Sequence, residues 1–192
     1  RWREAVCTRG AALAWDHSLR NTNPPKNLLS EYSSNLGPEF KDSEVEEILS
    51  NGKFKYRKVS QKDLFDIISD ELIDQKVIGW FQGRMEFGPR ALGNRSILAD
   101  TRDKSMKDKI NQRIKFREDF RPFAPVILED ETSNYFNLTV PSPFMLLTAE
   151  CKNNDFPAVI HVNNTARVQT VNQKQNSKLY NLLTTYNSKT NL

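Results

Sequence analysis

The chain of 192 residues contains little cysteine or histidine and no long hydrophobic run. Its two cysteines, Cys7 and Cys151, and its two histidines, His17 and His161, lie far apart in the sequence. This spacing argues against a disulfide framework and gives no pattern typical of a zinc site. No apolar run reaches the roughly 18 residues of a membrane-spanning helix, so no contact with a membrane is predicted. Because the N-terminus also lacks the apolar stretch of a signal peptide, we expect a cytoplasmic protein.

Glycine is scarce and unevenly placed. Four of the seven glycines lie within fifteen residues and none follows the last of them: Gly79, Gly83, Gly88 and Gly93. Basic residues gather in the same region, because residues 84–121 hold eleven Lys or Arg against six Asp or Glu, whereas the whole chain has a net charge of +4. The basic character therefore belongs to one stretch, which implies an anionic partner.

The hydrophobic spacing predicts short helices mixed with short strands. We expect helices at 43–49, 60–72, 103–114 and 176–186, and strands at 76–82, 125–128, 144–149, 158–162 and 167–171. This mixture indicates an α/β or α+β domain. The Asn- and Pro-rich segment 21–26 is typical of a linker and predicts a domain boundary nearby.

The predicted strand at 76–82 leads directly into a loop, residues 83–95, that is rich in glycine and arginine. Its glycines would allow backbone N–H groups to approach a ligand closely. Arg84, Arg90 and Arg95 carry planar guanidinium groups that match phosphate oxygens. The combination favours a phosphate-binding loop. Arginine stays charged, so such a site would stabilise a polyphosphate and would not supply a general base.

Most of these features also have an ordinary structural interpretation. The loop could carry surface arginines, Arg167 could be an exposed strand residue, and Lys115, Arg117 and Arg121 could form a solvated face. The phenylalanines at 116, 120 and 123 would then anchor an extended segment to the core.

Glu86 and His161 are two further candidates for a functional role. For Glu86 an ion pair with a neighbouring arginine is preferred over contact with magnesium or orientation of an arginine. His161 is interpreted as a strand residue and not as a catalyst.

Three motifs resemble the carbamoyltransferase family that includes nodulation-type and antibiotic-tailoring O-carbamoyltransferases. They are GRMEFGPRALGNRSIL at 83–98, KFR at 115–117 with FRPFAP at 120–125, and HV at 161–162 with TARVQTV at 165–171. The resemblance implies that residues 1–35 are the tail of a preceding transfer domain and a linker. Residues 36–192 would be a YrdC-like domain, a twisted open mixed sheet with flanking helices that we expect to be truncated at its C-terminus.

The resemblance also implies a reaction. The domain would bind ATP and carbamoyl phosphate, with magnesium carried by the nucleotide, and form carbamoyl adenylate. A separate N-terminal transfer domain, the expected place of any iron or other metal, would pass the carbamoyl group to a small-molecule hydroxyl acceptor. This chain alone is therefore expected to bind nucleotide without completing the transfer. By motif position the catalytic residues would be Lys115, Arg117 and Arg84. The residues that bind phosphate would be Arg90, Arg95, Arg121, Arg167, Gly83 and Gly88. No metal ligand is predicted.

The sequence departs from the family pattern in two motifs. Val126 stands where the family usually has serine, and Asn163-Asn164 stand where it usually has Asp-Gly, so one polar contact and one tight turn are in question. Two alternative functions remain. One is a nucleic-acid-binding YrdC-like module, since phenylalanines in the basic stretch could stack on bases. It is the less favoured, because acidic residues interrupt the arginines. The other is a non-catalytic ATP-binding remnant.

Overall fold

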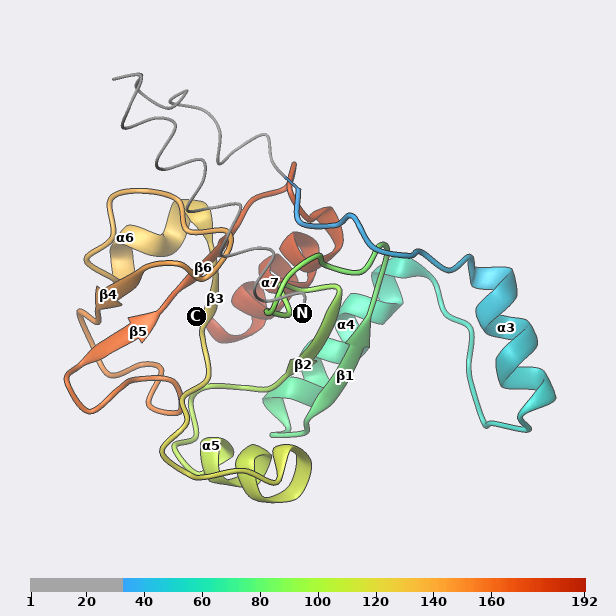
Figure 1. Ribbon diagram of the computed structural model, residues 1–192, viewed down its shortest axis with the longest axis horizontal. Helices are drawn as coiled ribbons and strands as arrows, with labels where there is room; N and C mark the ends of the chain where they lie inside the picture. The colour runs from blue at the N-terminus through green and yellow to red at the C-terminus, as the bar shows by residue number, and fades with distance from the viewer. Residues whose placement is uncertain (1–32) are drawn as a thin grey trace.

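The computed structural model describes residues 33–192, so the predicted tail and linker at 1–35 lie almost entirely outside the described part. The elements follow in the order α3 (Asp42–Asn51), α4 (Gln61–Ile73), β1 (Ile78–Phe81), β2 (Arg95–Leu98), α5 (Met106–Ile110), a π-helical turn (Asn111–Lys115), β3 (Val126–Leu128), a 3-10 turn (Glu129–Glu131), α6 (Thr132–Tyr135), β4 (Thr148–Glu150), β5 (Thr165–Arg167), β6 (Gln169–Val171) and α7 (Ser177–Thr190) (Figure 1). None of the helices among these residues is both long and apolar enough to span a bilayer.

The strands of residues 33–192 pair into three two-stranded sheets. β1 and β2 are antiparallel, β3 and β6 are parallel, and β4 and β5 are antiparallel. The predicted α/β class is confirmed. The strands are only three or four residues long and their ladders do not join into one open mixed sheet. The YrdC-like arrangement implied by the resemblance thus stays a prediction.

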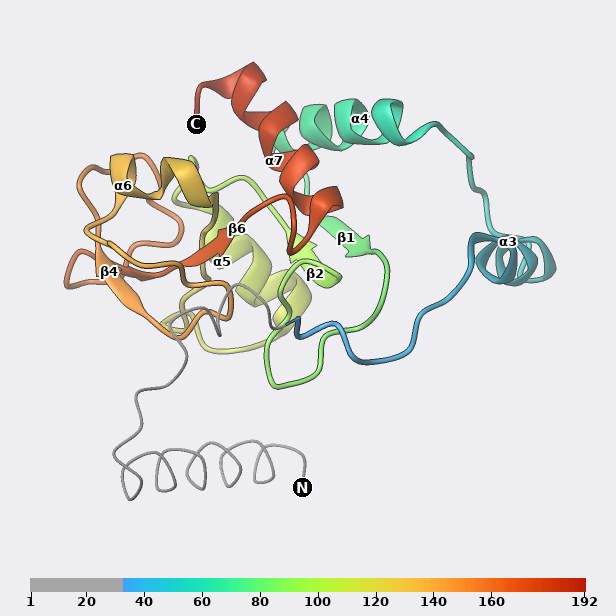
Figure 2. The same cartoon turned by 90° about the horizontal axis from the view of Figure 1, so that it is seen from above.

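Three hydrophobic clusters hold these elements together. The first joins α4 to α7, which lie side by side (Figure 2), and contains Phe65, Trp80 and Leu179. A second lies between β3, α6, β4 and β5, and a third lies beneath α5. Cys151 belongs to the second cluster, where burial and the nearby charge of Glu150 raise the pKa of its thiol.

Local capping chemistry explains where two helices begin. The Ser60 hydroxyl accepts the N–H of Asp63 at 3.2 Å and caps α4, whose start at Gln61 is one residue from the predicted start at 60. The side chain of Asn176 caps α7 in the same way. The helix expected at 43–49 forms as α3, which begins one residue earlier, at Asp42, and ends at Asn51.

The sequence placed some elements incorrectly. The segment 158–162 is not a strand, because residues 157–159 form a turn that starts at a proline. The strand expected at 144–149 begins only at Thr148. The strand expected at 76–82 forms as β1, yet of its residues only Trp80 is buried. The helix expected at 103–114 begins at Met106 and finishes as the π-helical turn.

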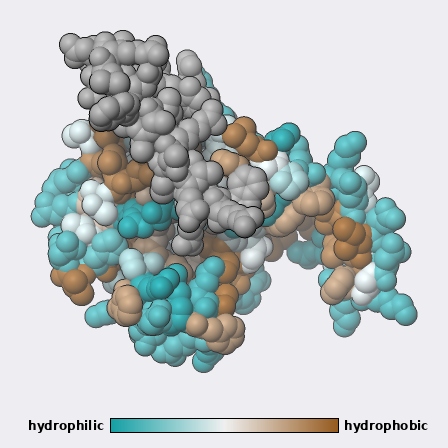
Figure 3. Space-filling view, viewed as in Figure 1, coloured by the Kyte–Doolittle hydropathy of each residue, from teal (hydrophilic) through white to brown (hydrophobic). Residues whose placement is uncertain are grey.

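Helix α3 stands apart from the other elements (Figures 1 and 2). None of its residues is buried, and Val45 and Ile48 are exposed. Figure 3 shows hydrophobic residues on the surface of this arm. The arm therefore adds no side chain to the three core clusters.

Candidate functional site

The glycine- and arginine-rich loop between β1 and β2 is organised around Glu86. Its carboxylate is buried and accepts the backbone N–H groups of Leu92 and Asn94, both at 2.7 Å, and that of Arg95 at 3.2 Å. Burial opposes the charged form, but these backbone hydrogen bonds outweigh it and lower the pKa of Glu86. Among the described residues Glu86 forms no ion pair, so the preferred interpretation of this residue is wrong. The Glu86 carboxylate is thus an anion that the loop itself supplies to its backbone N–H groups.

The glycines of the loop permit its path. Gly83 and Gly88 have φ values of +51° and +133°, which other residues rarely adopt. At Gly93, with φ +106°, an added Cβ would also collide with Leu179 of α7. The Gly93 N–H donates to Ser96 Oγ at 2.9 Å, so it is already bonded within the protein. Neither Gly83 nor Gly88 lines the cleft described next, and their predicted contact with phosphate stays a prediction.

A cleft of 320 Å³ lies beside the loop, within the roughly 300–1,000 Å³ typical of small-molecule sites. Its walls come from residues 89–91, from β2 and the segment after it, from α5 and its π-helical turn, and from β5 and β6. Five basic side chains line it: Arg90, Lys107, Lys115, Arg117 and Arg167. The structure thus brings together four residues that the sequence assigned to one site, and we call this space the cationic cleft.

The positive charge of the cationic cleft is not balanced within the described residues. None of its five basic side chains forms an ion pair in residues 33–192. Asp100 is the one carboxylate of the described part of the chain that lines the cleft, and it is bound by Arg102, with Nη2 and Oδ2 2.6 Å apart. Uncompensated like charges around a partly enclosed space favour the binding of an anion.

Two pKa shifts reflect this charge. Burial and the charge of Arg167 lower the pKa of the Arg90 guanidinium. Burial, Arg167 and Lys107 together lower the pKa of His161, which therefore stays neutral at pH 7. His161 lies outside the strands, contrary to the expectation, and its Nδ1 is 3.1 Å from Thr165 Oγ1.

Arg117 enters the cleft from the end of the π-helical turn. Its Nε donates to Asn111 Oδ1 at 2.8 Å, and its guanidinium lies 4.7 Å from the centre of the Phe123 ring. Neither Asn111 nor Lys107 was predicted to belong to the site. A signal was present, because Lys107, Asn111 and Lys115 recur at a spacing of four and so share one helical face.

Arg95 binds the backbone of its own loop. Its guanidinium donates to the carbonyl groups of Gln82 at 2.8 Å and Gly83 at 3.0 Å, and it stacks on the Phe81 ring at 3.5 Å. These contacts hold the Arg95 side chain on the loop, and Arg95 does not line the cationic cleft. A role in phosphate binding stays a prediction for this residue.

Arg84 and Arg121 also lie outside the cationic cleft. Arg84 is exposed and reaches the carbonyl of Leu36 at 3.5 Å. Arg121 pairs with Glu118 at 3.1 Å on the surface. The catalytic role of Arg84 and the phosphate-binding role of Arg121 therefore stay predictions.

The phenylalanines of this segment are also divided. Phe116 and Phe120 are 82% and 77% exposed, so the prediction that they anchor the segment to the core is wrong. Phe116 follows the π-helical turn with a left-handed backbone, φ +46°. Phe123 alone packs against the cluster beneath α5.

Residues 69–192 match the family described as "Carbamoyltransferase C-terminus". The chain belongs to this family. The matched region contains every basic residue of the cationic cleft, so the cleft is a feature of the carbamoyltransferase C-terminal domain itself.

Curated relatives extend the match. Nodulation protein NolO of Bradyrhizobium diazoefficiens is 40% identical over 198 residues, which cover 98% of this chain and 35% of NolO. Nodulation protein NolNO of Sinorhizobium fredii is 39% identical over 196 residues, 97% of this chain and 28% of NolNO. Protein sll1178 of Synechocystis is 39% identical over 200 residues, 91% of this chain and 32% of sll1178. The chain therefore spans about a third of the length of the curated relatives it matches.

The carbamoyltransferase domain retains the tight turn that its Asn163-Asn164 sequence put in question. Asn164 adopts the left-handed conformation, φ +56°, that the usual glycine would take. Asparagine tolerates this conformation better than most residues. Its side chain also donates to the carbonyl of Cys151 at 3.0 Å, so the turn is tied to the neighbouring strand.

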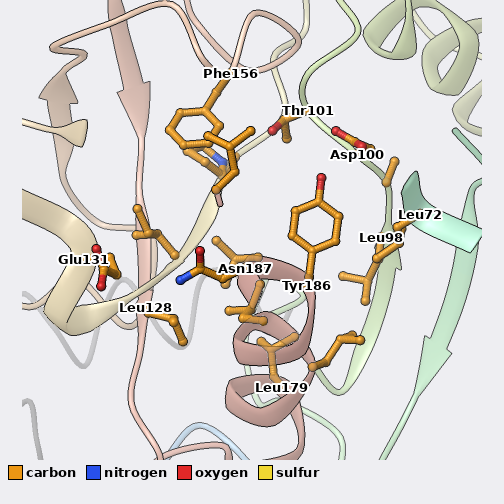
Figure 4. A pocket seen from close by; sticks show the side chains of 18 of the residues that line it. Leu72, Leu98, Asp100, Thr101, Leu128, Glu131, Phe156, Leu179, Tyr186 and Asn187 are labelled. Atoms are coloured by element: carbon orange, nitrogen blue, oxygen red, sulfur yellow. The ribbon is translucent and has the colours of Figure 1, made fainter. Parts of the chain in front are cut away.

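A second pocket, of 160 Å³, shares residues 97–101 with the cationic cleft (Figure 4). Its lining is mainly apolar and includes no basic side chain. Tyr186 points its hydroxyl toward Asp100, and burial together with the charge of Asp100 raises the pKa of Tyr186. This pocket of the carbamoyltransferase domain does not suit a polyphosphate.

Within residues 33–192, no group of three or more His, Cys, Asp or Glu side chains is arranged to hold a metal ion.

Proposed function

We propose that the cationic cleft binds ATP and carbamoyl phosphate and that the domain joins them into carbamoyl adenylate. One observation carries this proposal: five basic side chains from separate segments line a single cleft without ion-pair partners among the described residues. Two phosphate-bearing substrates would supply the missing negative charge. Membership of the carbamoyltransferase C-terminus family supports the choice of carbamoyl phosphate as one of them.

The proposed reaction has two balanced steps. Water first cleaves carbamoyl phosphate into carbamate and inorganic phosphate. A carbamate oxygen then attacks the α-phosphorus of ATP, the bond to the bridging oxygen breaks, and pyrophosphate leaves with the released electron pair. Reactions of this kind depend mostly on alignment and on stabilisation of charge on the phosphoryl oxygens. Arginine and lysine side chains provide both.

The basic residues of the cleft come from separate segments. Arg90 and Arg167 are close enough for the charge of Arg167 to help burial lower the pKa of Arg90, which suits two guanidinium groups around a shared oxyanion. Lys115 ends the π-helical turn, and Arg117 follows it two residues later. Magnesium would be carried by the phosphates of ATP. Transfer to a hydroxyl acceptor would take place in the additional domain of a longer protein.

Isotope exchange between ATP and pyrophosphate tests the proposal. The full-length protein should catalyse the exchange only when carbamoyl phosphate is present. Arg117→Ala should reduce the exchange rate by about 100-fold, because it removes a charge that stabilises the phosphoryl oxygens. Arg113→Ala is the matched control, since Arg113 is exposed in the same π-helical turn and does not line the cationic cleft. Undiminished exchange in the Arg117→Ala protein would reject the proposal.

The exposed rings of Phe116 and Phe120 favour a second candidate, binding of single-stranded RNA. These rings flank Arg117 and lie outside the cationic cleft. Filter binding of RNA at low and high salt separates the candidates. RNA binding predicts a steep loss of affinity with salt and a further loss in a Phe116→Ala, Phe120→Ala protein.

A further inference from the structure

We infer that Asn111 is a positioning residue that holds Arg117 so that both terminal nitrogens of its guanidinium group serve the bound anion; this rests on the proposed function. Asn111 is completely buried although it is polar, and it opens the π-helical turn. Buried polar side chains are normally satisfied by hydrogen bonds. The side-chain hydrogen bonds of Asn111 are made with Arg117 and Arg121, in the segment that follows the turn.

The hydrogen bonds of Asn111 define its orientation. Its Nδ2 donates to the carbonyl of Arg121 at 3.2 Å, and a carbonyl can only accept. The amide oxygen must therefore face the other way, where it accepts Arg117 Nε at 2.8 Å. The backbone carbonyl of Asn111 also accepts the N–H of Arg117 at 3.2 Å. Both the main chain and the side chain of Arg117 are thus tied to this one residue.

The π-helical turn makes this contact possible. The N–H of Phe116 bonds to the carbonyl of Asn111, five residues earlier, and Phe116 then adopts a left-handed backbone. The chain consequently returns toward Asn111 at Arg117, instead of continuing along the helix axis. Such wide turns occur often at functional sites.

The remaining surface of the Arg117 guanidinium is divided between protein and cleft. One face lies on the Phe123 ring, and Nε is bound to Asn111. Neither terminal nitrogen has a hydrogen-bond partner among the described residues, while Arg117 lines the cationic cleft. A guanidinium fixed in this way presents its two terminal nitrogens as a fork for phosphate oxygens.

The neutrality of Asn111 is part of the inference. An aspartate at this position could accept the same hydrogen bond, but its negative charge would neutralise Arg117 and compete with the substrate phosphate. An amide orients the guanidinium and leaves its charge available. Fixing the side chain before binding also lowers the entropy lost when the anion binds.

A double-mutant cycle in the full-length protein tests Asn111. Binding of magnesium pyrophosphate and of Mg·ATP is measured by calorimetry for the wild type, Asn111→Ala, Arg117→Ala and the double variant, with circular dichroism to check folding. Asn111→Ala should weaken binding by about tenfold in the wild type. It should have less than about a twofold effect in the Arg117→Ala background, because the residue acts through Arg117.

A second variant keeps the test independent of any folding defect in Asn111→Ala. Asn111→Asp keeps the side-chain volume and the acceptor of Arg117 Nε, although it loses the bond to the Arg121 carbonyl, and it should still weaken binding at least as much as Asn111→Ala. Equal losses in both backgrounds, or wild-type affinity in Asn111→Asp, would overturn the role of Asn111 while the proposed function stands. A wild-type protein that binds neither pyrophosphate nor Mg·ATP would overturn both.

Discussion

Glu86 illustrates how a single side chain can be misread from its neighbours in the sequence. It lies among arginines, which favours an ion pair, yet the loop turns three backbone N–H groups toward its carboxylate. Arg95 shows the converse, because its guanidinium binds backbone carbonyl groups. The partner of each charged group was decided by the path of the main chain, which the sequence motif does not reveal.

Replacement of Glu86 should therefore destabilise the fold. Glu86→Gln removes the charge that strengthens the three backbone hydrogen bonds and should lower the free energy of unfolding by about 1–3 kcal/mol. Urea denaturation at pH 7 measures this difference. Glu118→Gln is the matched control, since the surface pair with Arg121 contributes about 0–1 kcal/mol. Equal effects of the two substitutions would contradict the assigned role of Glu86.

The same carboxylate predicts a pH dependence. The folded-state pKa of Glu86 lies below its ordinary value of 4.5. Its contribution to stability is thus fully present above pH 4.5 and disappears as the pH falls through the lower folded-state pKa. The difference in stability between wild type and Glu86→Gln should shrink in acid. A difference that grows below pH 4.5 would show that the pKa is shifted upward.

At the scale of elements, local signals were reliable and pairing signals were not. The caps at Ser60 and Asn176 depend on neighbouring residues, so the starts of α4 and α7 were close to prediction. Strand pairing instead joins residues distant in sequence. The segment 158–162 has the apolar character of a strand but finds no partner, because residues 157–159 turn.

Contact between the loop and α7 predicts a strong effect of one added methyl group. Gly93→Ala would strain a positive φ and collide with Leu179, so it should lower the free energy of unfolding by about 1–3 kcal/mol. Gly79→Ala is the matched control, because no atom lies within 4 Å of the added Cβ. Thermal unfolding of both variants measures the contrast. Equal melting temperatures would mean that α7 does not pack closely on the loop.

At the scale of the whole molecule, the motifs predicted which segments meet at the cationic cleft, and the structure shows which side chains of those segments line it. Arg117 and Arg121 lie in one motif, yet the first lines the cationic cleft and the second pairs with Glu118 on the surface. A motif indicates which segments meet. It does not determine which way each side chain points in an irregular segment, because the turns there follow no fixed period.

The uncompensated charge of the cationic cleft predicts stabilisation by anions. Pyrophosphate bound in the cleft would stabilise the folded state, so it should raise the melting temperature more than sodium chloride of equal ionic strength. At 100 times its dissociation constant it should add about 2.7 kcal/mol to the free energy of unfolding. Arg167→Ala should lose most of this shift, whereas Arg113→Ala, at an exposed residue that does not line the cleft, should keep it. Differential scanning fluorimetry measures both. Identical shifts in the two variants would place the anion elsewhere.

The concealed thiol of Cys151 has a practical consequence. A thiol that is 4% exposed and has a raised pKa reacts with alkylating reagents only when the surrounding structure opens. It lies next to β4, whose partner strand β5 carries Arg167. In a Cys7→Ser protein, the rate at which Cys151 is alkylated would report how often the β4–β5 ladder opens. A bound anion should lower this rate.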